Sequence, residues 1–104
     1  MPLTSSQRVA LEASINSAIS NIPHVLDKWN QSSNIKRYQI DDINEFVYGL
    51  MVGFISNAFS NIIFISEGRV ATREETSESE EMILRRLPEI RSTIRKEIYY
   101  HHLR

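Results

Sequence analysis

The stretch FVYGLMVGFISNAFSNIIFI, residues 46–65, contains no charged side chain. Roughly 20 uncharged residues are enough for a helix to cross a bilayer. A helix of the same composition also forms the centre of small soluble bundles, where neighbouring helices cover its apolar sides. The stretch therefore decides between two fold classes: a soluble all-α bundle, and a single-span membrane protein through 46–65.

Polar and charged residues in and around this stretch favour the soluble bundle. Asn57 and Asn61 lie near its middle and would need hydrogen-bond partners inside lipid. Neither end carries a cluster of Lys or Arg or a Trp, which usually anchor a membrane span. The flanking charges are acidic instead, namely Asp41, Asp42, Glu45 and Glu67. We therefore expect a soluble protein and keep the membrane span as the second alternative.

Hydrophobic periodicity predicts three long helices, at about 5–30, 41–66 and 72–102, that form a bundle completed by homodimerisation. The first helix carries an apolar stripe made of Leu11, Ile15, Ala18, Ile19, Ile22, Val25, Leu26 and Trp29. The third carries a narrower stripe made of Ile83, Leu87, Ile90, Ile94, Ile98 and His101. The polar residues 31–39 between the first two helices are predicted to be a connection.

Capping residues mark the ends of the predicted helices. Three pairs have the spacing of a capping box, namely Thr4 with Gln7, Asp42 with Glu45, and Thr72 with Glu75. Asp41 is the alternative cap of the second helix, and Gly68 is expected to end it. Pro23 and Pro88 lie inside the first and third helices, where we expect each to produce a kink.

Length and composition indicate one domain, residues 1–104, without a recognisable catalytic motif. The chain has only 3 glycines and 3 prolines, which suits long helices better than a sheet with many turns. It has no cysteine, so disulfides and thiolate metal sites are excluded. No Gly-rich phosphate loop or G-x-S-x-G motif is present, and we expect neither an enzyme nor a cofactor. The opening MPLTSSQRVALEAS does not resemble a secretory signal, which favours a cytoplasmic location.

Small and polar residues form a narrow strip along the second predicted helix and are the candidate self-association interface. The strip consists of Gly49, Gly53, Ser56, Asn57, Ser60 and Asn61. Two glycines four residues apart allow two helix backbones to approach closely. The close approach can join two copies or can be a tight crossing inside one subunit. The wide apolar arc of this helix favours two copies, because two narrow stripes cannot cover it. We therefore expect a homodimer or higher oligomer.

The basic end of the third helix, residues 85–104, supports a first alternative, a nucleic-acid-binding regulator. Its candidate phosphate contacts are Arg91, Arg95, Lys96 and Arg104. The net charge of the whole chain is -1, which provides no general attraction to nucleic acid. His101 and His102 are adjacent and point about 100° apart on a helix, so they are not expected to bind one metal ion. The leading hypothesis is a noncatalytic interaction module that is structural, adaptor-like or regulatory and that can also bind another protein.

Overall fold

The computed structural model describes residues 2–102, and the side chains of residues 2–100. The helices are α1 (Ser5–Trp29), α2 (Ser32–Arg37), α3 (Ile43–Glu67) and α4 (Arg73–His102). No strand occurs in residues 2–102, so the predicted all-α class is confirmed. The predicted connection at 31–39 was wrong in part, because it contains the short helix α2.

Helix α2 is held by contacts with the end of α1. The Asn34 side-chain amide donates to the carbonyl oxygen of Lys28 at 2.7 Å. Just after α2, the ring of Tyr38 packs edge-to-face on Trp29, with 5.0 Å between the ring centres. Six residues are too few for an apolar stripe, and tertiary contacts therefore determine this helix more than its own periodicity does.

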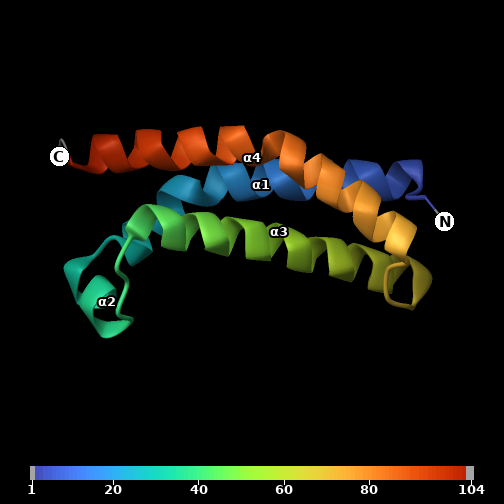
Figure 1. Ribbon diagram of the computed structural model, residues 1–104, viewed down its shortest axis with the longest axis horizontal. Helices are drawn as coiled ribbons and strands as arrows, with labels where there is room; N and C mark the ends of the chain where they lie inside the picture. Colours follow the sequence, from blue (N-terminus) through green and yellow to red (C-terminus); the bar gives the residue numbers. More distant parts are fainter. Residues whose placement is uncertain (1, 103–104) are drawn as a thin grey trace.

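The three long helices lie side by side in an elongated body that measures 47 × 24 × 17 Å (Figure 1). Helix α3 runs antiparallel to both α1 and α4 and contacts both. Helix α2 lies at the end of the body where α1 finishes and α3 begins. Within residues 2–102, α3 thus packs against α1 and α4 and has one side that no long helix covers.

The caps of α1 and α3 lie at predicted residues, but the predicted capping box of Asp42 with Glu45 is only half formed, because the Glu45 carboxylate pairs with Arg91. At the start of α1 the backbone N–H of Gln7 donates to Thr4 Oγ1 at 3.1 Å, while Gln7 Oε1 accepts from the N–H of Thr4 at 2.8 Å. Asp42, not Asp41, caps α3, and its carboxylate accepts from the N–H groups of the next helical turn. Gly68 ends α3 in the left-handed conformation at φ 67°, which costs little without a Cβ atom.

The start of α4 combines a capping box with an ion pair. Glu75 Oε1 accepts from the N–H of Thr72 at 2.8 Å, and the N–H of Glu75 donates to Thr72 Oγ1 at 3.1 Å. Arg69 also donates to both carboxylate oxygens of Glu75, at 2.8 and 3.0 Å. Hydrogen bonding to Arg69, followed by that to Thr72, lowers the pKa of Glu75 to about 2. This cluster fixes the turn between α3 and α4.

Helices α1 and α4 both continue through their prolines, Pro23 and Pro88. A proline removes one backbone donor and bends a helix without necessarily ending it, if the packing on both sides is kept. Figure 1 shows α4 bending along its length so that it follows α1. The apolar side chains on both sides of each proline therefore reach the same core.

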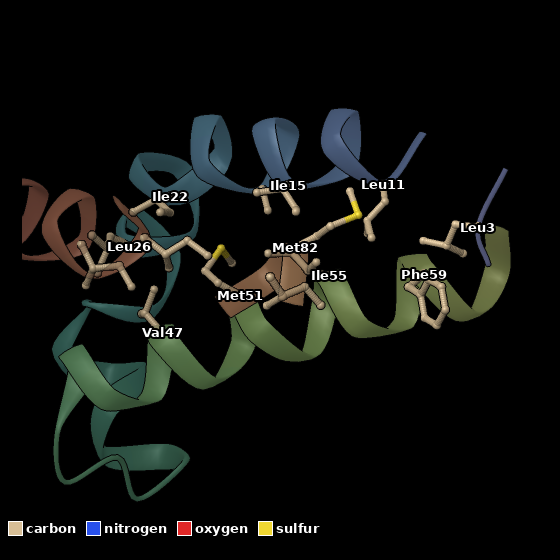
Figure 2. Close-up of a cluster of buried hydrophobic side chains, with 14 of the residues drawn as sticks. Leu3, Leu11, Ile15, Ile22, Leu26, Val47, Met51, Ile55, Phe59 and Met82 are labelled. Carbon is tan, nitrogen blue, oxygen red and sulfur yellow. The ribbon is translucent and has the colours of Figure 1, made fainter. Parts of the chain in front are cut away.

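The core is a single layer of apolar side chains between the three long helices (Figure 2). Helix α1 contributes Leu11, Ile15, Ala18, Ile22 and Leu26, and α3 contributes Val47, Met51, Ile55, Phe59 and Ile63. Helix α4 adds Met82, Ile83, Ile90 and Ile94. Polar contacts join the helices at the edge of this layer. For example, the buried Gln7 donates to Ser66 and Glu67 at the end of α3, at 3.0 and 3.1 Å.

Candidate interaction surface on helix α3

Helix α3 buries one narrow line of side chains and exposes the opposite one. Its buried residues recur at every fourth position, from Val47 to Ile63. A residue two positions further along a helix points about 200° away. The positions two residues after each buried one are all exposed, namely Gly49, Gly53, Asn57, Asn61 and Ile65. Helix α3 therefore presents a continuous uncharged ridge to solvent.

All six residues of the predicted interface lie on this exposed side. We define the outer face of α3 as Gly49, Gly53, Phe54, Ser56, Asn57, Ser60, Asn61, Phe64 and Ile65, all of which are exposed. Phe54, Phe64 and Ile65, which the sequence prediction did not include, keep 52%, 64% and 83% of their surface in contact with solvent. The outer face thus carries large apolar side chains in addition to the small and polar residues predicted from the sequence.

The glycines of the outer face are not required by packing inside the subunit. A Cβ atom added at Gly49 or Gly53 would meet no heavy atom within 4 Å. Each glycine in a helix interior costs about 1 kcal/mol relative to alanine. The sequence left open a tight crossing of α3 with a neighbouring helix of the same subunit, and the free space around both positions argues against it.

An open apolar groove of about 690 Å³ runs between α1 and the first half of α3. Its lining consists of Val25, Trp29, Glu45, Phe46, Gly49, Leu50, Met51, Gly53 and Phe54. The ring of Trp29 packs edge-to-face on Phe46 with 5.1 Å between the ring centres, which holds both rings at one end of the groove. The sequence signal for this groove was the four-residue spacing of Phe46, Leu50 and Phe54, which the sequence analysis did not use.

A smaller groove of about 220 Å³ lies on the other side of α3, against α4. Its lining includes Val52 and Ser56 of α3 and Leu84 and Leu87 of α4, and Leu84 is 61% exposed. Apolar surface therefore continues from the outer face of α3 onto both neighbouring helices.

Polar groups of the outer face differ in whether they are satisfied within the subunit. The Ser60 hydroxyl donates to the carbonyl oxygen of Ser56 at 3.3 Å, as serine often does within a helix. The amides of Asn57 and Asn61 are exposed and make no hydrogen bond to any residue in the described part of the chain. Two neutral amides are thus available in the middle of an uncharged surface.

The basic end of α4 is partly occupied by contacts inside the subunit. Arg91 donates to Glu45 Oε1 and Oε2 at 2.7 and 3.2 Å, and its guanidinium lies 3.4 Å from the centre of the Tyr48 ring. Hydrogen bonding to Glu45 raises the pKa of Arg91. Arg95 and Lys96 are exposed, whereas Arg104 lies outside the described residues. One of the four predicted nucleic-acid contacts is therefore committed to α3.

The remaining predicted features give no second site. Among the described side chains, no group of three or more His, Asp or Glu residues gathers as metal ligands would. The side chains of His101 and His102 lie outside the described ones. By length and composition α3 could cross a membrane, and only 22% of its most apolar window is buried. Within the described residues, these features therefore add no second candidate site to the outer face of α3.

Comparisons with protein-family models, with curated proteins and with solved structures found no match to this chain. Its function must therefore be inferred from the geometry and chemistry of its own surface.

Proposed function

We propose that this protein is a noncatalytic helical interaction module that acts as a homodimer, and that the outer face of α3 is its dimer interface. In this proposal the bundle is completed by the second copy, whose α3 covers the side that α1 and α4 leave open. The role is structural, adaptor-like or regulatory, and the dimer is the form that presents α1, α4 and the ends of the body to other proteins.

The observation that carries the proposal is the uncharged, exposed face of helix α3 that extends from Gly49 to Ile65. Exposed apolar side chains in soluble proteins are usually scattered, and a contiguous apolar patch marks an interaction site. Here Phe54 is exposed beside two glycines around which the subunit leaves free space, and Phe64 and Ile65 are exposed at the other end of the face. Uncharged Ser and Asn side chains connect the two ends. A second helix lying on the face would bury these side chains and would use the space above the glycines.

The total surface of the chain also supports a partner. A compact monomer of this mass, 12.1 kDa, is expected to expose about 6,000 Å². The observed surface is 6877 Å², and the radius of gyration is 15.4 Å where about 13 Å is expected for a compact chain of this length. The excess is roughly 850 Å², close to the 800 Å² that each partner contributes to a stable interface of standard size.

Spanning a membrane through 46–65 is less consistent with the packing of α3. The two helices packed against α3 carry ion pairs on their surfaces, for example Arg8 with Glu78 and Arg86 with Glu12. If α3 crossed a bilayer while keeping its neighbours, these charges would enter the hydrocarbon layer, which is costly. The membrane alternative therefore requires α1 and α4 to leave α3.

Of its four candidate phosphate contacts, the nucleic-acid alternative keeps two that are described and exposed, Arg95 and Lys96. A protein that binds DNA through phosphates usually needs several such contacts, because each contact contributes a modest electrostatic gain. With Arg91 held by Glu45, this region is a weaker candidate than the outer face of α3.

The test is whether thermal stability depends on protein concentration. For a homodimer that unfolds to monomers, each tenfold rise in concentration adds about 1.4 kcal/mol to the apparent stability, so Tm increases. We expect this increase for the wild type and for Ser17→Leu, on the exposed side of α1. Gly53→Leu places a large side chain on the outer face, where its Cβ atom meets no heavy atom within 4 Å, and its Tm should lose the dependence. A wild-type Tm that is constant over a hundredfold dilution range would contradict the proposal.

A further inference from the structure

We infer that two copies pair α3 against α3 in antiparallel orientation, about a two-fold axis at Asn57, and that Ile65 of each copy packs on Gly49 of the other, at the groove between α1 and α3. This inference rests on the proposed dimer and specifies its geometry. The occupant of the groove is thus a second copy of the same helix.

Along the centre line of the outer face, which consists of Gly49, Gly53, Asn57, Asn61 and Ile65, small residues come first and the bulky residue comes last. Gly49 and Gly53 lie in the first half of α3, next to the groove lined by Trp29. The most exposed apolar side chains of the helix, Phe64 and Ile65, lie in its second half. The glycines therefore leave space in the first half of the face, and Ile65 projects from the second half. The two halves fit each other when one copy is reversed.

The positions of these residues determine the register. An antiparallel pair with its axis at Asn57 places Gly53 opposite Asn61 of the second copy, and Gly49 opposite Ile65. Since the rise is 1.5 Å per residue, Ile65 lies about 12 Å from the axis, level with Gly49 and the middle of the groove. The axis also brings the two Asn57 amides together, where they can satisfy each other.

A parallel pair would use the same face less well. It would place glycine on glycine in one half and Ile65 on Ile65 in the other, leaving a gap at one end and crowding at the other. It would also bring together the acidic starts of both helices, where Asp41, Asp42 and Glu45 lie. Antiparallel packing separates these charges and aligns the helix dipoles favourably.

Introduced cysteines can test the register directly, because the chain has no cysteine of its own. A disulfide requires Cα atoms about 4.4–6.8 Å apart. In the antiparallel pair two residues at position 57 meet, whereas the two residues at position 61 are about 12 Å apart along the axis. We therefore expect Asn57→Cys to form a disulfide-linked dimer on mild oxidation and Asn61→Cys alone to form none. A mixture of Gly53→Cys and Asn61→Cys should give the mixed dimer, and the exposed Ser17→Cys on α1 is the control.

The molar mass of each reduced variant, measured by light scattering, tests whether the protein is a dimer. The pattern of disulfides tests how the two copies of α3 are arranged. A reduced dimer with the expected disulfides supports both. A reduced dimer in which Asn61→Cys and Gly53→Cys each link efficiently to themselves indicates a parallel pair and overturns the inference alone. A reduced dimer that forms no disulfide through α3 overturns the antiparallel register, and a reduced monomer for every variant and for the wild type overturns the proposed function as well.

Discussion

Arg91 of α4 and Glu45 of α3 form a two-point ion pair, with the guanidinium nitrogens 2.7 and 3.2 Å from the two carboxylate oxygens. The two residues are 46 positions apart in the sequence, and Tyr48 supplies a ring below the guanidinium. The pair joins the second half of α4 to the first turn of α3, so it orients the start of the outer face relative to the rest of the bundle.

Replacing Arg91 with glutamine should remove the ion pair and the ring contact together. The pair is partly exposed, and exposed ion pairs and cation–π contacts each contribute up to about 1 kcal/mol. We expect Arg91→Gln to lower the free energy of unfolding by about 1 kcal/mol in urea denaturation at fixed protein concentration. Arg95→Gln, on the exposed side of the same helix, is the matched control and should change it by less than about 0.5 kcal/mol. Equal effects of the two changes would show that the pair with Glu45 does not stabilise the fold.

The buried line and the outer face of α3 should respond differently to truncation. Ile55 is fully buried, and Ile55→Ala should cost about 2–5 kcal/mol of unfolding free energy because it leaves a cavity. Asn57→Ala, two residues further on, should leave the stability of the monomer within about 0.5 kcal/mol, since the amide is exposed. Urea denaturation at a concentration where dissociation is complete measures both. A large loss for Asn57→Ala under that condition would place its side chain in the monomer core.

Glycines at the end and in the middle of α3 should give opposite results. Gly68 has φ 67°, which strains any residue with a Cβ atom, so Gly68→Ala should destabilise the protein by about 1 kcal/mol. Gly53→Ala should stabilise the dissociated monomer by up to about 1 kcal/mol, because alanine is the better helix former and no atom lies in its way. Urea midpoints of the dilute variants provide the comparison. A destabilising Gly53→Ala would mean that the helix needs this glycine within the subunit.

Glu75 should make stability depend on acid pH. Its pKa is about 2 in the folded protein against 4.5 as the ordinary value, so folding favours the ionised form. Its contribution is therefore complete above about pH 4.5 and is lost as the pH falls towards 2. Glu75→Gln keeps a capping acceptor but cannot titrate, and its stability curve should be flatter than that of the wild type between pH 5 and 2. Parallel curves for the two proteins would show that the contact with Arg69 does not favour the charged form.

Trp29 provides a spectroscopic signal for the groove, because it is the only tryptophan of the chain and lines that groove. We expect its fluorescence emission to shift to longer wavelength on dilution, when the second copy leaves. Phe64→Ser should show the shifted emission at higher protein concentration than the wild type. Val9→Ser, at an exposed position of α1 that is 70% accessible, should behave as the wild type. Identical dilution curves for Phe64→Ser and the wild type would remove Phe64 from the interface.

The parts of the fold that depend on residues close together in the sequence could be predicted. The capping boxes at Thr4 and Thr72 and the stop at Gly68 involve residues within one turn, and all three occur as expected. Helix α2 could not be predicted, because tertiary contacts with α1 hold its six residues. Its polar sequence resembles a loop.

The candidate surface could be predicted only as a set of residues. Small residues at regular spacing identified one side of α3, but not whether that side faced α1, α4 or solvent. Which side of α3 is exposed depends on which of its side chains are buried. The buried side chains can be identified only when the positions of α1 and α4 are known. The same reason explains Arg91, whose charge suggested a phosphate contact although its partner Glu45 lies on another helix.

The central claim is that a second copy covers the outer face of α3, and the molar mass in solution tests it most directly. Light scattering during gel filtration without detergent should give twice the chain mass of 12.1 kDa for the wild type and for Ser17→Leu. Gly53→Leu should shift the mass towards that of a single chain while the helical circular dichroism is retained. A wild type that remains a monomer at high concentration, or that is soluble only in detergent, would contradict the claim.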